Sequence, residues 1–109
     1  MTEDKIQQEI FIYFSQNYPT GLIFAVPNGG SRNKREGKKL KNTGVLAGVS
    51  DLILIMPNSK VLFVEVKMPN GRQREKQIKF ETKINNLKHT YAIVKSLSDF
   101  KELLILWGG

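Results

Sequence analysis

Two closely spaced apolar runs dominate the hydrophobic pattern of the chain. The first covers residues 52–56, the second covers residues 61–66, and the turn formers proline, asparagine and serine lie between them. Short runs of aliphatic and aromatic residues that are bounded by turn residues predict buried strands. We therefore expect an antiparallel hairpin at the centre of the fold.

Charged residues gather at one end of this predicted hairpin. Asp51 precedes the first strand, and Glu65 and Lys67 lie at the end of the second strand. Because side chains alternate along a strand, Glu65 and Lys67 share a face. Burying ionised groups is costly unless they are paired or bind a metal, so this cluster indicates a functional site.

The length of the hairpin loop decides whether Asp51 joins that face. A four-residue turn places Asp51 opposite Val66, whereas a three-residue loop places it opposite Glu65. A site that contains both carboxylates therefore requires the odd loop or a bulge. Asn58 or Ser59, in the left-handed position of a type I turn plus bulge, would provide one.

Amphipathic helices and further strands are predicted around the hairpin. In chain order they are a helix from the cap Thr2 to a stop before Pro19, a strand at 22–26, a short helix at about 32–42 between Ser31 and Gly44, a helix at about 73–87, a strand at 91–94, and a last helix capped by Ser98. This order predicts an α/β fold with a mixed four-stranded sheet flanked by helices (α-β-β-β-α-β-α). The strand at 91–94 should run parallel to the second hairpin strand.

Two polar residues on apolar helix faces are further candidates for the site. On a helical wheel Glu3 falls on the apolar stripe of the first helix, whereas Glu9 lies about 80° from its centre. Glu3 is therefore the carboxylate that we expect to point inward, although it would also complement the helix dipole. Gln77 lies on the inner face of the helix at 73–87, either as a partly solvated boundary residue or as a group that contacts Lys67 or a phosphate at the site.

The chain is strongly basic, with a formal net charge of +7, and this favours a polyanionic partner. Many of its cations cluster between the first strand and Asp51, and others follow the hairpin. The candidate phosphate contacts are Asn28, Arg32, Lys34, Arg35, Lys38, Lys39, Lys41, Arg72 and Arg74. The cluster is either solvated surface or, as its position favours, a phosphate-contacting flap over the site.

The absence of cysteine excludes disulfides and cysteine-bound zinc, and neither a secretory signal nor a membrane span is evident. We therefore expect a cytoplasmic protein without a membrane partner. The length of 109 residues predicts one small domain covering residues 1–109.

The residues around the charged cluster resemble the virus-type replication-repair nuclease (VRR-NUC) domain, in its stand-alone phage form, within the PD-(D/E)XK superfamily. The resemblance covers about the whole chain. It is carried by Asp51 and Glu65-Val66-Lys67, and by the neighbouring segments 26–32, 40–41, 44–45 and 47–52 with Gln77 and Phe80. Ser50 departs from the pattern, because many relatives have proline there.

This resemblance implies a restriction-endonuclease-like fold and a structure-specific DNA endonuclease that cuts branched DNA such as Holliday junctions or flaps. Its cofactor would be Mg²⁺ or Mn²⁺, and its location the host cytoplasm if a phage encodes it. The implied metal ligands are Asp51, Glu65 and the main-chain carbonyl of Val66. Lys67 would position or help to deprotonate the attacking water, and the implied catalytic set is completed by Gln77 and Glu3.

Other functions remain open on the sequence. A non-catalytic DNA- or RNA-binding module could keep the fold, with Glu65 and Lys67 as a surface ion pair. A sequence-specific restriction nuclease is disfavoured, because the chain leaves little room for a recognition region. Two symmetric cuts in a junction require two sites, so we expect a homodimer. Residues 103–107 are apolar around the helix and offer an interface, unless they only close the core of the monomer.

Overall fold

The computed structural model describes residues 1–27 and 34–108, except for the side chains of residues 34–36. In chain order the elements are α1 (Glu3–Asn17), β1 (Leu22–Ala25), α2 (Lys34–Asn42), β2 (Leu52–Met56), β3 (Lys60–Val66), α3 (Glu75–Asn86), β4 (Thr90–Val94) and α4 (Leu97–Trp107). The strands form one sheet in the order β1-β2-β3-β4, with β4 parallel to β3 and the other pairs antiparallel. The predicted α/β fold with a mixed four-stranded sheet is confirmed. Among the described residues, no helix is long and apolar enough to cross a membrane.

The central hairpin of β2 and β3 has the three-residue turn that the site requires. Asn58 and Ser59 both adopt left-handed backbone conformations, with φ of 67° and 63°. The strand register then places Asp51, directly before β2, across from Glu65 on β3. Both carboxylates therefore lie on the same face of the sheet, as expected for an odd loop.

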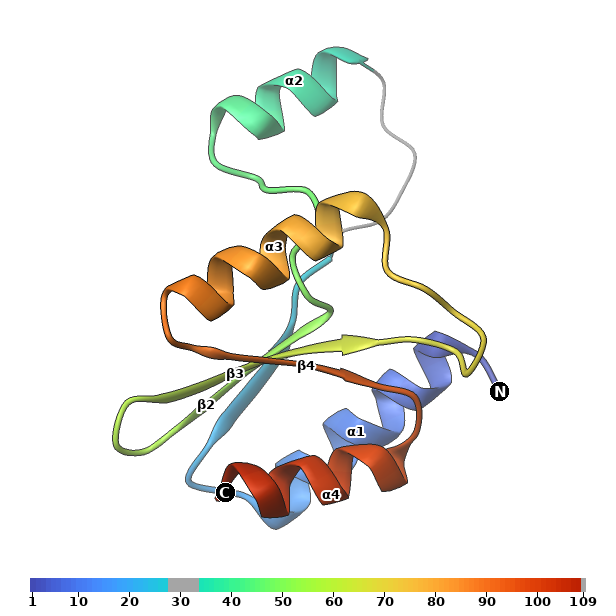
Figure 1. Cartoon of the computed structure of the whole chain (residues 1–109), viewed down its shortest axis with the longest axis vertical. Helices are drawn as coiled ribbons and strands as arrows, with labels where there is room; N and C mark the ends of the chain where they lie inside the picture. Colours follow the sequence, from blue (N-terminus) through green and yellow to red (C-terminus); the bar gives the residue numbers. More distant parts are fainter. Residues whose placement is uncertain (28–33, 109) are drawn as a thin grey trace.

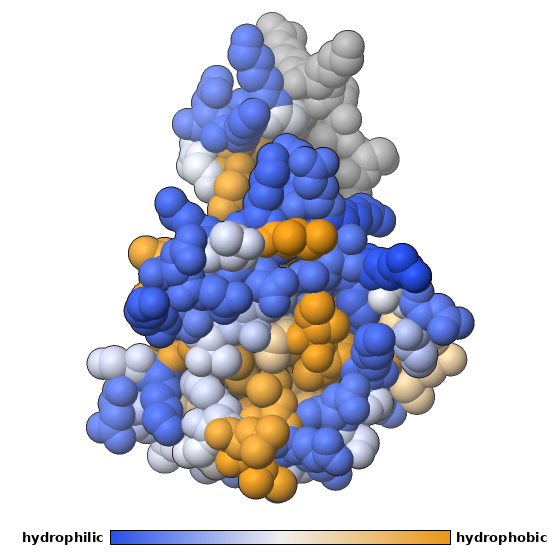
Figure 2. All heavy atoms as spheres, in the orientation of Figure 1, coloured by the Kyte–Doolittle hydropathy of each residue, from blue (hydrophilic) through white to orange (hydrophobic). Residues whose placement is uncertain are grey.

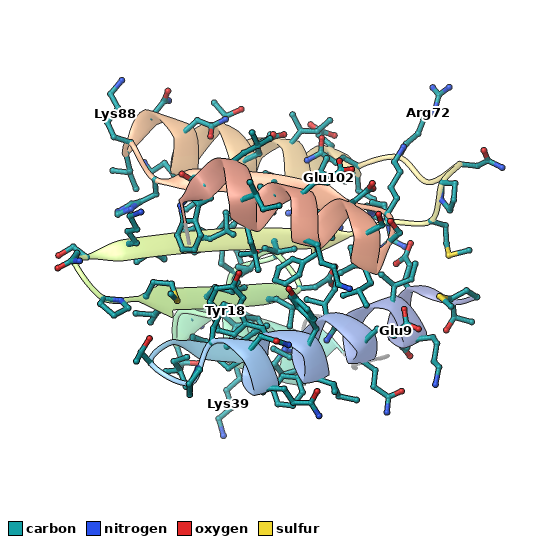
Figure 3. All side chains as sticks on the ribbon, turned by 90° about the horizontal axis from the view of Figure 1, so that it is seen from below. Glu9, Tyr18, Lys39, Arg72, Lys88 and Glu102 are labelled. Atoms are coloured by element: carbon teal, nitrogen blue, oxygen red, sulfur yellow. The ribbon has the colours of Figure 1, made fainter. Side chains whose placement is uncertain are left out.

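Helices cover both faces of the sheet, which Figure 1 shows nearly edge on. α1 and α4 lie side by side against one face, and α3 lies against the other (Figures 1 and 3). Between the sheet and the α1–α4 layer is the main core, built from Ile6, Ile10, Phe14, Ile23, Leu52, Leu54, Leu62, Val64, Val66, Val94, Phe100 and Leu104. This core holds the central strands rigidly, so their ends are well placed to support a site.

α3 packs on the opposite face through aromatic residues. The ring of Phe80 lies edge to face against Phe63 of β3 and Tyr91 of β4, with centroid distances of 5.7 and 6.1 Å. Ile84, one turn further along α3, is also buried. These contacts fix α3 over β3 and β4, and its first turn thereby reaches the end of β3.

α2 ends in a glycine-stabilised turn at the far end of the molecule from α4 (Figure 1). Gly44 has a φ of 101°, its N–H donates to the carbonyl of Lys41, and the N–H of Val45 donates to Leu40 at 3.0 Å. This bonding pattern is the Schellman motif, so the predicted stop at Gly44 is confirmed. The predicted cap Ser31 lies outside the described residues.

The predicted cap of the last helix is wrong by two residues. Ser96, not Ser98, adopts the extended conformation of an N-cap, and its hydroxyl accepts a hydrogen bond from the N–H of Asp99 at 3.0 Å. Asp99 in turn accepts from the N–H of Lys95, which strengthens the earlier start. Because both serines precede an apolar run, the sequence pattern alone did not separate them.

Candidate active site

Asp51 is fixed at the sheet end by both its backbone and its side chain. Its carbonyl accepts from the N–H of Val26 at 2.9 Å, and its Oδ2 accepts from the N–H of Val66 at 2.7 Å. The fully buried Ser50 precedes it and donates to the carbonyl of Leu52 at 3.2 Å. Serine thus supports the turn into β2 through a hydrogen bond.

Glu65 is a buried carboxylate whose two oxygens have different surroundings. Its side chain is 2% exposed. Oε2 accepts from Nε2 of Gln77 at 2.8 Å and lies 3.5 Å from Nζ of Lys67. Oε1 is buried and has no hydrogen-bond partner among the described residues. Buried polar atoms are nearly always paired, so this oxygen marks a place for a ligand.

Both carboxyl groups of this pair are poorly solvated. Burial, with a smaller contribution from the charge of Asp51, raises the pKa of Glu65 to about 7, and Lys67 only partly opposes these effects. Burial also raises the pKa of Asp51, against the opposing effect of the hydrogen bond from Val66. Two carboxyl groups with raised pKa values lie close together, and Lys67 alone does not supply enough positive charge to stabilise both in the ionised form.

Gln77 connects the first turn of α3 to this pair. Its Oε1 accepts from the N–H of Arg74 at 2.8 Å, while its Nε2 donates to Glu65. The amide is thereby held in one orientation by the helix start. Gln77 therefore belongs to the cluster, with Glu65 rather than Lys67 as its partner.

The first turn of α1 reaches the same strand end. Oε2 of Glu3 accepts from the N–H of Met68 at 3.3 Å, directly after Lys67. The charge of Glu3 contributes to the raised pKa values of both Asp51 and Glu65. Glu9 lies about 9 Å further along the helix axis. The geometry therefore favours Glu3 as the third carboxylate near the site.

The basic residues that were predicted to contact phosphate are distributed around this end and around α2. Lys38, Lys39 and Lys41 lie on α2, which stands beyond α3 rather than over the carboxylates (Figure 1). Arg72 extends away from the sheet (Figure 3), and Arg74 caps α3. Asn28 and Arg32 lie outside the described residues, and so do the side chains of Lys34 and Arg35. In the described part, α2 therefore stands apart from α3 and does not lie over the carboxylate pair.

The donor set suits a hard divalent cation. Two carboxylates and the carbonyl of Val66 offer oxygen donors, which Mg²⁺ and Mn²⁺ prefer, and Mg²⁺ usually keeps several waters. The described residues contain no cluster of three or more histidine, cysteine or acidic residues that could enclose a metal. The unpartnered Oε1 of Glu65 fits an open site of few protein ligands better than a closed one.

Comparison with known proteins then gives the family. The family model of the VRR-NUC domain matches residues 1–97, which include every residue of the carboxylate cluster. This chain belongs to the VRR-NUC family. The predicted resemblance to the VRR-NUC domain is thus confirmed, whereas the phage form and the superfamily stay predictions, and a nuclease-type fold is established for the chain.

Solved VRR-NUC structures share the architecture. A structure named "VRR_NUC domain protein" superposes with a TM-score of 0.78 at 18% identity, covering 98% of this chain and 88% of the other. A second, named "VRR_NUC domain", gives a TM-score of 0.69 at 21% identity, covering 94% and 92% of the two chains. No curated protein sequence matches the chain.

Two features that support the VRR-NUC site were not apparent from the sequence. Nε2 of Gln73 donates to Glu81 at 3.0 Å and to the hydroxyl of Tyr91 at 3.2 Å, which ties the segment before α3 to β4. Gly48, with a φ of 88°, packs its backbone against α3. No sequence motif predicts either contact. Gly48, three residues before Asp51, signals only that the backbone there can adopt an unusual conformation.

Proposed function

We propose that this VRR-NUC domain is a divalent-metal-dependent endonuclease that hydrolyses phosphodiester bonds in DNA. The observation that carries the proposal is the buried, unpartnered Oε1 of Glu65 beside Asp51 at one sheet end. A structural role alone would leave this oxygen paired or in solvent. A cation site explains why two carboxyl groups, both with pKa values raised chiefly by burial, lie together at one sheet end.

Each residue of the cluster has a distinct role in this proposal. Asp51, Glu65 and the carbonyl of Val66 would hold Mg²⁺ or Mn²⁺, which polarises the scissile phosphate and lowers the pKa of a bound water. Lys67, 3.5 Å from Glu65, supplies positive charge to the phosphate and orients the attacking water. Gln77 fixes Glu65 through its hydrogen bond.

Substitution of the charged residues tests the assignment. Glu65→Gln, Asp51→Asn and Lys67→Ala should each reduce DNA cleavage in Mg²⁺ or Mn²⁺ below detection, while the shift of labelled DNA in a gel persists. Glu75→Gln is the control, because Glu75 is exposed on α3 and its ion pair with Lys79 is solvated. Cleavage by Glu65→Gln at the wild-type rate would overturn the assignment. If the wild-type protein shifts DNA without cutting it in either metal, the domain is a binding module.

We also propose that the substrate is branched DNA, such as a junction or flap. The support is the excess of basic residues, including exposed lysines on α2 at a distance from the carboxylates. Reversing Lys38 and Lys39 to glutamate should weaken binding and flatten the slope of log affinity against log salt by about 2, because each phosphate contact contributes about 0.9. Reversal of Lys5 and Lys101, on the α1–α4 side, is the control and should leave the slope nearly unchanged. If both double variants give the same slope of log affinity against log salt, the lysines of α2 do not contact phosphate and are ordinary solvated surface.

Two symmetric cuts need two active sites, and we propose that two copies of the chain pair to provide them. The support is the exposed apolar pair on α4, Ile105 at 77% and Leu106 at 87% exposed. Figure 2 shows hydrophobic surface over α4 at the bottom of the view. Trp107 packs partly against the core, so the interface would be centred on the exposed pair and not on the tryptophan.

A further inference from the structure

A groove of about 730 Å³ lies between α2 with its following loop and α3. Its walls are largely apolar, formed by Leu40 and Val45 on one side, Leu46 on the loop, and Phe80 on α3. Leu46 is 58% and Val45 is 44% exposed. Two adjacent exposed aliphatic side chains beside Leu40 and Phe80 form a contiguous apolar patch, and such patches mark binding sites more often than single exposed residues do.

The rim of this groove is positively charged. Lys41 lies on α2, and Lys76, Lys79 and Lys83 follow one another along α3. None of the described residues that line the groove is acidic. Figure 2 shows hydrophobic surface between α2 and α3 with hydrophilic surface on both sides. An apolar floor with cationic edges suits a ligand that has flat apolar groups and regularly spaced negative charges.

Both walls of the groove continue directly into the carboxylate cluster. On α3, Lys76 lines the groove, and the next residue, Gln77, donates to Glu65. On the loop, Ala47 lines the groove and Asp51 follows four residues later. The two walls are held together where Gly48 packs against the backbone of Lys76. A polymer that occupies the groove would therefore leave it beside the proposed cleavage site.

We infer that the groove binds an unpaired DNA strand that extends from the branch point, with its bases on the apolar floor and its phosphates on the lysine rim. This inference rests on the proposed function and extends it, because it specifies which part of a branched substrate enters which part of the domain. A single strand exposes both the faces of its bases and its phosphates, and apolar or aromatic surfaces with basic edges bind such strands without sequence preference. A duplex hides its base faces and would contact only the rim.

The mixed character of the groove also separates this occupant from other ligands. An acidic amphipathic peptide or an anionic lipid would satisfy the charge and the floor. Neither accounts for the continuity of both walls with the carboxylate cluster, whereas a strand leaving a scissile bond does. A DNA strand is therefore the occupant that the position of the groove favours.

Binding of a single strand in EDTA tests the groove without any need for cleavage. The probe is a fluorescent oligothymidine of about 15 nucleotides, within the range of common single-strand site sizes. Leu46→Glu should weaken its binding by about fivefold or more, because it removes an apolar contact to the bases and places a negative charge beside the phosphates. Affinity for a duplex of equal length should change much less.

Leu87→Glu is a matched control. Leu87 is also 58% exposed, lies at the end of α3, and does not line the groove, so it introduces the same charge at the same exposure. Lys83→Glu is a second variant on the rim and should weaken binding of the single strand in the same way, with Lys5→Glu as its control. Circular dichroism verifies that each variant is folded.

The outcomes separate this inference from the nuclease assignment. Equal oligothymidine affinities for Leu46→Glu and Leu87→Glu would overturn the groove assignment, even if the wild-type protein cleaves DNA. An equal loss for single strand and duplex would also overturn it, since only charge would then matter. Selective loss of single-strand binding supports the groove even in a protein that proves unable to cleave. In a cleaving protein, Leu46→Glu should slow cutting of flaps with an unpaired arm more than cutting of a nicked duplex.

Discussion

Glu65 has the strongest pH dependence that the structure indicates. Its pKa is raised from 4.5 to about 7, chiefly by burial, so the folded protein binds a proton more tightly than the unfolded chain. Binding of this proton therefore stabilises the folded state fully below pH 4.5, and this stabilisation is lost as the pH rises to about 7. The effect is on the order of 3 kcal/mol, at about 1.4 kcal/mol per pKa unit.

Thermal unfolding in EDTA checks this prediction. The midpoint of the wild-type protein should fall between pH 5 and pH 8, whereas Glu65→Gln, which cannot ionise, should show a much smaller fall over about this range. Adding Mg²⁺ or Mn²⁺ should raise the wild-type midpoint more at the upper end of the range, because only the ionised carboxylate binds the cation well. A stabilisation by metal that is independent of pH, or retained in Glu65→Gln, would contradict the proposed ligand.

Gln77 acts on the reaction through Glu65. Gln77→Leu keeps the approximate size but removes the hydrogen bond to Oε2, so the pKa of Glu65 should rise further. We expect a 10- to 100-fold loss of cleavage, the usual cost of removing a partner of a metal ligand, and a shift of the pH–rate profile to higher pH. A uniform loss with an unchanged profile would mean that Gln77 only supports packing.

For single residues, the sequence predicted which side chains belong to the carboxylate cluster better than it predicted their hydrogen-bond partners. Asp51, Glu65 and Lys67 were placed together because strand periodicity is strict, and the odd loop followed from the requirement that both carboxylates share a face. The partner of Gln77 could not be predicted, because it depends on how deeply α3 packs on the sheet. The bond from Glu3 to the strand end depends in the same way on the packing of α1.

At the scale of elements, two glycines differ in whether packing requires them. A Cβ at Gly48 would overlap the carbonyl of Lys76, and the φ of 88° disfavours any larger residue. A Cβ at Gly37, inside α2, would meet nothing within 4 Å. The first position therefore holds the loop against α3, whereas the second is merely a poor helix former.

Alanine at each position separates these roles. Gly48→Ala should destabilise the domain by at least about 1–3 kcal/mol through backbone strain alone, and it should reduce cleavage by moving α3 and Gln77 away from Glu65. Gly37→Ala should instead stabilise by about 0.5–1 kcal/mol, because α2 gains a better helix former. Chemical denaturation and cleavage rates measure both effects. An unaffected cleavage rate in Gly48→Ala would show that this contact does not position α3.

The elements that the sequence predicted best are those with a strong local pattern. The hairpin follows from two apolar runs, and the stop of α2 follows from Gly44. The cap of α4 was misplaced because Ser96 and Ser98 are locally equivalent, and the bond between Asp99 and Lys95 decides between them. The position of α2 beyond α3 had no local signal, since α2 makes no close backbone contact with another described element and only the connecting segments place it.

On the scale of the whole molecule, the distribution of exposed groups separates two ends. Basic residues and the groove lie with α2 and α3, whereas the exposed apolar pair lies on α4 at the opposite end (Figures 1 and 2). Pairing through α4 would therefore leave both carboxylate clusters and both grooves accessible to DNA. This separation is what a two-site nuclease requires, and the sequence did not show it, because helical periodicity does not give the relative positions of distant helices.

The mass of the protein in solution tests that arrangement. Light scattering at the concentrations used for cleavage should give about twice the chain mass of 12.4 kDa. Leu106→Glu should convert the protein to a monomer, because a charge buried in an apolar interface costs several kcal/mol, while Leu87→Glu, on α3, should leave the dimer intact. The monomeric variant should still cut flaps but should nick four-way junctions on one strand only. A monomeric wild-type protein that cuts both junction strands symmetrically would exclude pairing through α4 as the source of the second cut.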